Sequence, residues 1–388
     1  MKSARLFLYV QHLLGVGHLA RAAALARALA ARGIEVTFAT GGLPVPELMP
    51  GGVRIVQLPP ARAAGLDFRT LLDASGQPVD DAWRASRRAA LLGAWRQVRA
   101  HALVTELFPF GRRQMRFELL PLLEEAGGAR PRPLVVASVR DILGGGKDPA
   151  KEDEMLATFE RHYDRVLVHG DPALVGFGES FRHAARLGAR LHYTGYLADP
   201  GAAGAPRAAA DGAGEVLVSA GGGAVGSKLL ETAIRARRLS PLADRRWRLL
   251  AGTNLAPQAF EALCAQARAE AGEGIVVERF RADFAARLAH CALSVSQAGY
   301  NTVVATLAAG ARAVLVPFSG GGETEQRRRA RRLAERGLFE CVDEEALSPE
   351  TLAAAIARAQ ARPAPAPGAV DLGGARASAA LLARWIAH

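Results

Sequence analysis

The chain has 388 residues and half of them are hydrophobic, which suits two packed domains of roughly 150–200 residues each and excludes a disordered chain. Its net charge of +11 is spread over both halves instead of being gathered in one arm, and only 6% of the residues are aromatic. This pattern suits anionic small molecules or an anionic membrane surface as partners, and it disfavours nucleic acid.

Three widely spaced cysteines without a CxxC pair indicate a reducing cytoplasm and give no metal site. The first apolar run, Leu6–Val10, is interrupted too soon by Gln11 and His12 to be a signal peptide. No run of about 18 apolar residues predicts a membrane span. We therefore expect a cytoplasmic protein, with a peripheral contact at the inner face of the plasma membrane as the alternative.

In residues 1–198 short apolar runs alternate with amphipathic stretches, which predicts parallel strands covered by helices and an N-terminal, acceptor-side domain. The predicted strands are Ala4–Val10, Ile34–Thr40, Val53–Leu58, Ala102–Glu106, Pro133–Ser138 and Arg165–His169. The predicted helices include His18–Arg32, Trp83–Ala100 and Arg112–Glu125. Residues 199–214 are mostly Gly, Ala and Pro, and this composition is typical of a linker.

The same alternation then restarts and predicts a second domain over residues 215–365, followed by a C-terminal tail and helix over 366–388. The expected strands are Glu215–Ala220, Trp247–Ala251, Ile275–Phe280, Ala292–Gln297, Ala313–Phe318 and Phe339–Val342. The expected helices are Ser227–Arg238, Gln258–Ala271, Asn301–Ala309 and Thr324–Arg336. The last helical stretch, Ala377–His388, fits either domain. The predicted fold class is α/β, with two Rossmann-like domains facing across a cleft where ligands meet the carboxyl ends of the strands.

The first motif, Gly15-Val16-Gly17-His18, lies between the first strand and the first helix. Its glycines let the backbone approach a ligand, and Gly17 opens a helix whose N–H groups can bind an anion. The second strand ends in Ala39-Thr40-Gly41-Gly42 without the acidic residue of a dinucleotide site, so NAD is set aside. His18 fits a general base that deprotonates an acceptor hydroxyl. The alternative is a helix-capping histidine at the surface.

Three further strand-to-helix junctions in the second half are rich in glycine and polar residues. The stretch Ser219–Gly226 can cradle a diphosphate with its N–H groups, or it is only a flexible turn. The stretch Ser296–Thr302 can present hydroxyl and amide groups to phosphate at a helix start, or it only caps that helix. The stretch Pro317–Gln326 ends in side chains that can hold a sugar, or its acids only favour the helix dipole. The candidate donor-binding residues in these junctions are Gly221, Gly222, Gly223, Gln297, Gly299, Asn301, Thr302, Glu325 and Gln326.

An arginine-rich run follows, Arg327–Arg332. We expect it to be a solvated helix face. The alternative is a contact with anionic lipid or with a lipid-linked acceptor.

The whole layout resembles the GT-B glycosyltransferases, and most closely family 28. The resemblance covers nearly the whole chain and is strongest over 275–337, from Val277-Glu278-Arg279-Phe280 through Ser294–Gly299 to Glu325-Gln326. It implies that the backbone near Phe280 and Arg281 reads the nucleotide base. By the same likeness, the glycine loop at 221–226 and Thr302 hold the diphosphate, Gln326 touches the donor sugar and His18 is the base.

One position departs from the family pattern. Members of family 28 usually carry a Glu, three residues after the Thr, that binds the ribose, and the matching residue here is Ala305. The segments Thr105–Arg113 and Ser138–Asp141 also differ and suggest a different acceptor. The N-terminal half is closer to a group of predicted glycosyltransferases that open with Gln-His-Leu-Leu-Gly-x-Gly-His.

The expected reaction is an inverting transfer of a hexose or N-acetylhexosamine from a nucleoside-diphosphate sugar, with UDP as the family-level nucleotide, to a small-molecule or lipid-linked acceptor. His18 would remove the acceptor proton, oriented by Asp141 or Glu106 at neighbouring strand ends. The only paired aspartates, Asp80-Asp81, lie in a polar stretch, so no metal and no cofactor beyond the donor are expected. Two alternatives stay open. The Gly15–Arg21 string also resembles the nucleotide-sugar hydrolase of pseudaminic acid synthesis, and Ala305 fits a binding protein without turnover.

Overall fold

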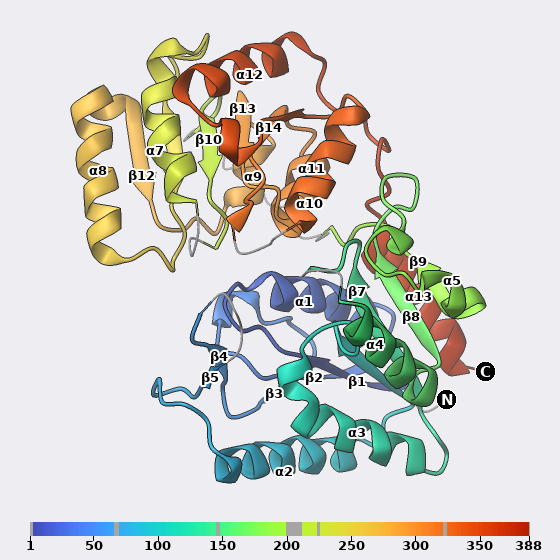
Figure 1. The fold of residues 1–388 in the computed structure, drawn as a ribbon. Helices are drawn as coiled ribbons and strands as arrows, with labels where there is room; N and C mark the ends of the chain where they lie inside the picture. Colours follow the sequence, from blue (N-terminus) through green and yellow to red (C-terminus); the bar gives the residue numbers. More distant parts are fainter. Residues whose placement is uncertain are drawn as a thin grey trace. The chain divides into compact units, whose positions relative to one another are not determined.

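The computed structural model describes residues 3–65, 70–144, 148–198, 212–222, 226–320 and 324–387. The contacts divide the chain into two compact units. Unit 1 comprises Met1–Leu143, Lys147–Leu197 and Gly373–His388, and unit 2 comprises Gly144–Gly146 and Ala198–Leu372. Each unit is an α/β layer structure built on one parallel sheet (Figure 1).

Unit 1 holds a seven-stranded sheet in the order β3-β2-β1-β6-β7-β8-β9, with every neighbouring pair parallel. Its strands are β1 Arg5–Val10, β2 Glu35–Thr40, β3 Arg54–Gln57, β6 Ala102–Glu106, β7 Leu134–Arg140, β8 Arg165–His169 and β9 Leu191–Tyr193. A short antiparallel pair, β4 Arg62–Ala63 and β5 Leu71–Leu72, lies outside this sheet. Its helices are α1 Gly17–Ala30, α2 Asp81–Val98, α3 Arg116–Gly128, α4 Pro149–His162, α5 Ala184–Leu187 and α13 Gly374–Ala387.

Both faces of this sheet are buried, because successive side chains of a strand point to opposite faces. On β1, Phe7 and Tyr9 join the apolar cluster that includes residues of α2, α3 and α4. Leu6 and Leu8 join the opposite cluster, which includes residues of α1 and α13. The sequence did not decide which domain the C-terminal helix belongs to. In the structure this helix, α13, packs in unit 1, against α1.

Unit 2 holds a six-stranded parallel sheet in the order β12-β11-β10-β13-β14-β15. Its strands are β10 Val216–Ser219, β11 Trp247–Leu250, β12 Ile275–Glu278, β13 Leu293–Ser296, β14 Ala313–Leu315 and β15 Glu340–Cys341. Its helices are α7 Ser227–Ala236, α8 Pro257–Ala271, α9 Phe284–Leu288, α10 Tyr300–Ala308, α11 Glu325–Glu335 and α12 Pro349–Ala361. The main core packs α7, α8 and α12 on one face, and a smaller cluster lies under α9 and α10 on the other.

The strand order reverses once in each sheet, between β1 and β6 in unit 1 and between β10 and β13 in unit 2. The loops that leave neighbouring strands at such a point run to opposite faces of the sheet and leave a crevice at the carboxyl ends, which is where open α/β sheets bind ligands. The fold alone therefore predicts two binding positions, one in each unit.

Candidate active site

In unit 1, two candidate residues meet at the point where the strand order reverses. His18 is the second residue of α1, just after the loop that leaves β1, and Glu106 is the last residue of β6. The Nδ1 atom of His18 lies 3.1 Å from Oε1 of Glu106. The carboxylate is buried, whereas 13% of the His18 side chain is exposed. This arrangement holds Nδ1 of the imidazole against the buried carboxylate and leaves a small part of the His18 side chain accessible.

Arginines surround this pair. Arg21, one turn along α1 from His18, donates to Oε1 of Glu106 and also lies 2.9 Å from Nδ1 of His18. Burial lowers the pKa of His18 well below its ordinary value of 6.5, and the charges of Arg112, Arg21 and Arg140 and the nearby His12 lower it further. His18 is therefore a neutral imidazole at neutral pH, which is the form that a general base requires.

The basic surroundings of His18 were not predicted from the sequence. Arg112 has a left-handed backbone (φ 58) and donates from Nε to the carbonyl oxygen of Gln11, 2.9 Å away. Burial lowers the pKa of Arg112 to about 10, with a further contribution from Arg140. The spacing of Arg21 three residues after His18 places both on one face of a helix and was the only signal of this cluster in the sequence.

The other acid proposed for His18 has different partners. Asp141 follows β7 and is fully buried. Its carboxylate accepts a hydrogen bond from the hydroxyl of Tyr196 at 2.8 Å and one from the backbone amide of Ile142 at 2.9 Å. Of the two acids, Glu106 is the one that the structure places against His18.

In unit 2, a glycine-rich loop leaves β10 at the reversal of the strand order. Gly221 and Gly226 have positive φ angles of 65° and 116°, which disfavour other residues. A Cβ atom on Gly226 would lie 2.8 Å from the Cβ of Ala220 and 3.0 Å from Nε2 of Gln297. The amide of Asn254 donates to the carbonyl of Gly222 at 3.0 Å. Gly223 lies outside the described residues. Gly226 thus lies close to Ala220, just after β10, and to Gln297, just after β13, and directly precedes α7.

The neighbouring junction supplies a second helix start. Gly299 caps α10, and Asn301 and Thr302 lie half-buried in its first turn. Ala305, one turn on, packs beside an apolar cluster that includes Leu217. At the position where the resemblance to family 28 predicts a ribose-binding Glu, this chain therefore has a methyl group in an apolar contact.

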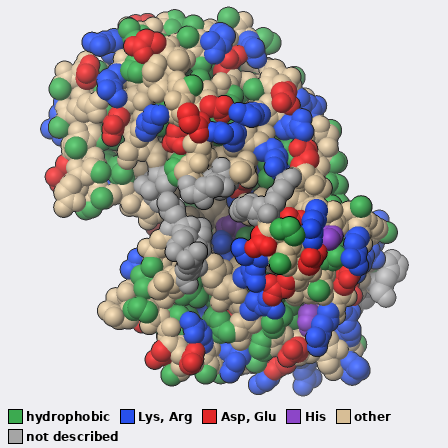
Figure 2. All heavy atoms as spheres, viewed as in Figure 1, with side chains coloured by type: hydrophobic (Ala, Val, Ile, Leu, Met, Phe, Trp, Pro, Cys, Tyr) green, Lys and Arg blue, Asp and Glu red, His purple; other side chains and the backbone are tan. Residues whose placement is uncertain are grey.

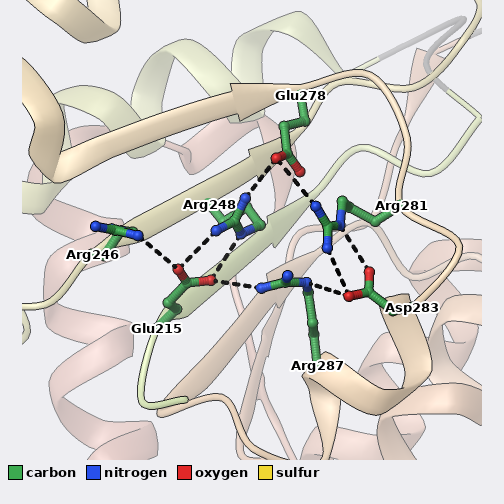
Figure 3. Close-up of polar contacts among 7 residues, drawn as sticks. All are labelled: Glu215, Arg246, Arg248, Glu278, Arg281, Asp283 and Arg287. Atoms are coloured by element: carbon green, nitrogen blue, oxygen red, sulfur yellow. Dashed lines mark hydrogen bonds and ion pairs between the residues drawn. The ribbon is translucent and has the colours of Figure 1, made fainter. Parts of the chain in front are cut away.

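The segment after β12 is held by an ion-pair network (Figure 3). Arg281 donates from Nε and Nη2 to the two oxygens of Asp283, each at 2.8 Å. This contact, followed by the charges of Arg287 and Arg281, lowers the pKa of Asp283 to about 2. Glu278 accepts from Arg248 at 2.6 Å and lies 3.6 Å from Arg281. The side chain of Arg281 thus belongs to this network, so the predicted base contact is left to its backbone.

Phe280, between Glu278 and Arg281, is one of the exposed large hydrophobic residues, with 59% of its surface accessible.

The first turn of α11 carries the two candidates for the donor sugar. Glu325 is 3% exposed and accepts from Arg329 at 2.8 Å. Oε1 of Gln326 accepts from the amide of Phe318 at 3.2 Å. Arg329 is fully buried and also donates to the carbonyl of Ala298, so the expectation of a solvated face for the whole arginine run is wrong at this position. Arg329 lies inside because it links the start of α11 to the junction before α10.

Residues 218–369 match the glycosyltransferase family 28 C-terminal domain. Over 81 residues, 21% of its length, this chain is 38% identical to a relative from Methylibium petroleiphilum. That relative is a UDP-N-acetylglucosamine--N-acetylmuramyl-(pentapeptide) pyrophosphoryl-undecaprenol N-acetylglucosamine transferase. That match spans about a fifth of the relative's length, 22%.

Solved structures extend the likeness of fold over the whole chain. MurG of Acinetobacter baumannii has a TM-score of 0.57 at 17% identity, covering 98% of this chain and 99% of its own. The calicheamicin glycosyltransferase CalG4 has a TM-score of 0.60 at 16% identity, covering 100% of this chain and 95% of its own. The chain has the GT-B fold, and its residues 218–369 resemble the C-terminal domain of family 28.

In this chain the predicted residues form one group in each unit. His18, Gly17 and Glu106 lie around the reversal of strand order in unit 1. Gly221, Gly222, Gln297, Gly299, Asn301 and Thr302 lie at the corresponding edge in unit 2. Their roles stay predictions.

The described residues contain no group of three or more His, Cys, Asp and Glu side chains that would suit a metal ion. Within the same residues, no helix has the length and apolar character needed to cross a membrane.

The arginines of α11 are largely matched by acids: Arg327 pairs with Glu345, and Arg331 pairs with Asp343 at 2.9 Å. On the visible face of the molecule, basic and acidic side chains are interspersed (Figure 2). The predicted contact with an anionic membrane stays a prediction.

Proposed function

We propose that this chain is a GT-B glycosyltransferase that moves a hexose or N-acetylhexosamine from a nucleoside-diphosphate sugar, with UDP as the first candidate nucleotide, to the hydroxyl of a small-molecule or lipid-linked acceptor. The transfer is inverting and needs no metal. The observation that carries the proposal is the pairing of His18 with buried Glu106 at the reversal of strand order in unit 1.

The proton on His18 is assigned from its neighbours. A guanidinium nitrogen only donates, and a carboxylate oxygen only accepts. Arg21 already donates to Oε1 of Glu106. A proton on Nδ1 of His18 gives this carboxylate a second donor and leaves Nε2 as the free basic nitrogen. The opposite tautomer would let Nδ1 accept from Arg21, 2.9 Å away. It would also set the lone pair of Nδ1 against the carboxylate and put a proton where the base must accept one, so the proposed reaction uses the Nδ1–H form.

The reaction then balances as a single displacement. The acceptor hydroxyl gives its proton to Nε2 of His18, and its oxygen bonds to the anomeric carbon of the sugar. The bond from that carbon to the diphosphate breaks, and the nucleoside diphosphate leaves with the electron pair. The N–H groups of the loop at Gly221 and the starts of α7 and α10 would stabilise the developing negative charge. Such preorganised donors are typically worth about 3 kcal/mol each in the transition state.

The test is the release of nucleoside diphosphate from a panel of nucleotide-sugars, with and without crude lipid and small-molecule acceptors. His18→Ala and Glu106→Gln are compared with His162→Ala, which removes a histidine from the last residue of α4. Acceptor-dependent release that falls about 10²- to 10⁴-fold in His18→Ala but not in His162→Ala supports the proposal.

Two other outcomes would replace the proposed transfer reaction by another function. Release without any acceptor assigns nucleotide-sugar hydrolysis, the reaction suggested by the Gly15–Arg21 string. Binding of nucleotide-sugars without release of any product makes Ala305 the decisive residue and leaves a binding protein.

A further inference from the structure

Glu106 has a second oxygen, and a chain of hydrogen bonds leads away from it through the core of unit 1. Oγ of Ser138 lies 2.7 Å from Oε2 of Glu106 and 2.9 Å from Nε2 of His169. Nδ1 of His169 lies 2.9 Å from Oγ1 of Thr194. These hydrogen bonds thus cross four neighbouring strands, since Glu106 ends β6, Ser138 is in β7, His169 ends β8 and Thr194 follows β9.

All three added side chains are buried: Ser138 is 1% exposed, His169 0% and Thr194 3%. Burying a polar side chain costs free energy unless it is hydrogen-bonded, and three apolar residues would fill the same place without that requirement. The hydrogen-bonded series ends, on the side of the site, at the carboxylate that contacts His18. Polar side chains that only filled the core would not need to reach that carboxylate.

The directions of the hydrogen bonds follow from the available protons. A serine hydroxyl has one proton, and the carboxylate of Glu106 can only accept, so Ser138 donates to Glu106. Nε2 of His169 must then donate to Ser138. Burial lowers the pKa of His169 to about 3, so the ring is neutral and its other nitrogen, Nδ1, accepts from Thr194. The distance from Thr194 Oγ1 to this nitrogen, 2.9 Å, is shorter than its 3.1 and 3.4 Å to the carbonyls of Gly195 and Val168.

Every donor in the chain therefore points toward Glu106. We propose that Ser138 and His169 are positioning residues for catalysis, which hold the Glu106 carboxylate against His18. This inference rests on the proposed function, in which His18 is the base. The chain carries no proton during the reaction: the acceptor proton stays on His18 Nε2, and aligned donors stabilise the carboxylate beside the imidazolium that forms.

Without the chain, Glu106 keeps Arg21 as its charged partner and is free to turn away from the imidazole. His18 would then accept from Arg21 at Nδ1 and carry its proton on Nε2, the wrong nitrogen for a base. The consequence is a loss in the rate of the chemical step while donor binding, which belongs to unit 2, is unchanged.

The test compares two replacements of the same histidine. His169→Leu removes both nitrogens, whereas His169→Gln keeps an amide N–H near the place of Nε2. We expect His169→Leu to lower kcat by about 10- to 100-fold with the KM for the donor unchanged, and His169→Gln to recover most of that loss. Ser138→Ala, a smaller change, should reproduce the loss if His169→Leu does not fold.

Tyr163→Phe is the matched control. It removes a buried hydrogen bond, the 2.8 Å contact between the Tyr163 hydroxyl and Oγ1 of Thr105, from the same unit. It should lower thermal stability and leave kcat unchanged. An unchanged kcat in Ser138→Ala, or an equal loss in the Leu and Gln variants of His169, would overturn the proposal.

A second readout does not need turnover. The nitrogen chemical shifts of His18, in protein labelled at its nine histidines, report which ring nitrogen carries the proton. The Nδ1–H form should dominate in the wild type and the Nε2–H form should grow in Ser138→Ala. If no donor is turned over but this change occurs, the proposed reaction fails and the positioning chain stands. If the tautomer does not change, the chain does not hold Glu106 and the inference fails.

Discussion

Replacing Arg87 by methionine tests whether the interior of unit 1 depends on a buried ion pair. Arg87, on α2, is fully buried and donates to both oxygens of Glu118 on α3, at 2.8 and 2.9 Å. The same guanidinium donates to Oε1 of Gln11 at 2.6 Å and to the carbonyl of Gly41 at 2.8 Å. Methionine fills a similar volume but satisfies none of these acceptors.

The expected cost follows from what the substitution leaves behind. Glu118, also fully buried, would keep the Tyr9 hydroxyl as its remaining described partner. Removing one member of a buried ion pair typically costs about 3–5 kcal/mol, because the other charge is left uncompensated. In a unit of roughly 200 residues, 1 kcal/mol changes Tm by about 2–4 °C, so we expect a fall of about 6–20 °C. Adding Glu118→Met should recover part of the loss, since the uncompensated charge disappears.

The same two helices supply the control. Arg96 on α2 pairs with Glu125 on α3, but 65% of the Arg96 side chain is exposed. Arg96→Met should therefore change stability only slightly, because exposed ion pairs are screened by water and salt. Thermal unfolding followed by circular dichroism measures both variants. Equal losses for Arg87→Met and Arg96→Met would refute the argument that burial sets the cost.

Three further predictions concern the candidate site. Because the pKa of His18 lies well below 6.5, its neutral form persists as the pH falls, and the acid limb of the kcat–pH profile should have its midpoint below pH 6.5. A midpoint at or above that value would contradict the assignment of His18 as the base. Gly226→Ala should weaken UDP binding, measured by calorimetry, by roughly tenfold, because the new methyl group would lie 2.8 Å from the Cβ of Ala220 and the backbone of residue 226 has a φ angle of 116°. An unchanged affinity would show that the loop does not hold the diphosphate. Asp283→Asn should weaken UDP binding by about two- to fivefold with kcat unchanged, because Arg281 loses a partly exposed partner; an effect on kcat alone would argue against a role in donor binding.

The strand-to-helix junctions could be predicted from the sequence because they depend on local patterns. The predicted strand Ala4–Val10 differs from β1 by one residue. Of the four motifs that were singled out, those that follow β1, β10 and β13 lie where the strand order reverses, and the fourth follows β14. Two helices that were not assigned also carried local signals. Asp148 and Pro149 begin α4, and Ser348 caps α12 with a capping box.

The choice of partners between distant strands could not be predicted in this way. The sequence allowed Asp141 or Glu106 beside His18, because both follow or end predicted strands. Only the register of the sheet and the path of the first helix place Glu106 within 3.1 Å. The buried arginines were missed for a similar reason. A run such as Arg327–Arg332 gives no sign that Arg329 turns inward, since this depends on Glu325 and on a carbonyl from another junction.

The position of α13 has a consequence for how this protein is made. The last segment of unit 1 follows unit 2 in the chain, yet its helix α13 covers one face of the unit 1 sheet, with Ala379 and Leu382 in the core. At a synthesis rate of about 5–20 residues per second, the ribosome needs roughly 10–40 s to make unit 2 and reach α13. During that time the apolar strip on α1 that α13 will cover is open to solvent and to chaperones. A circular permutant that begins with residues 373–387 would supply this helix first and let unit 1 close before unit 2 is synthesised.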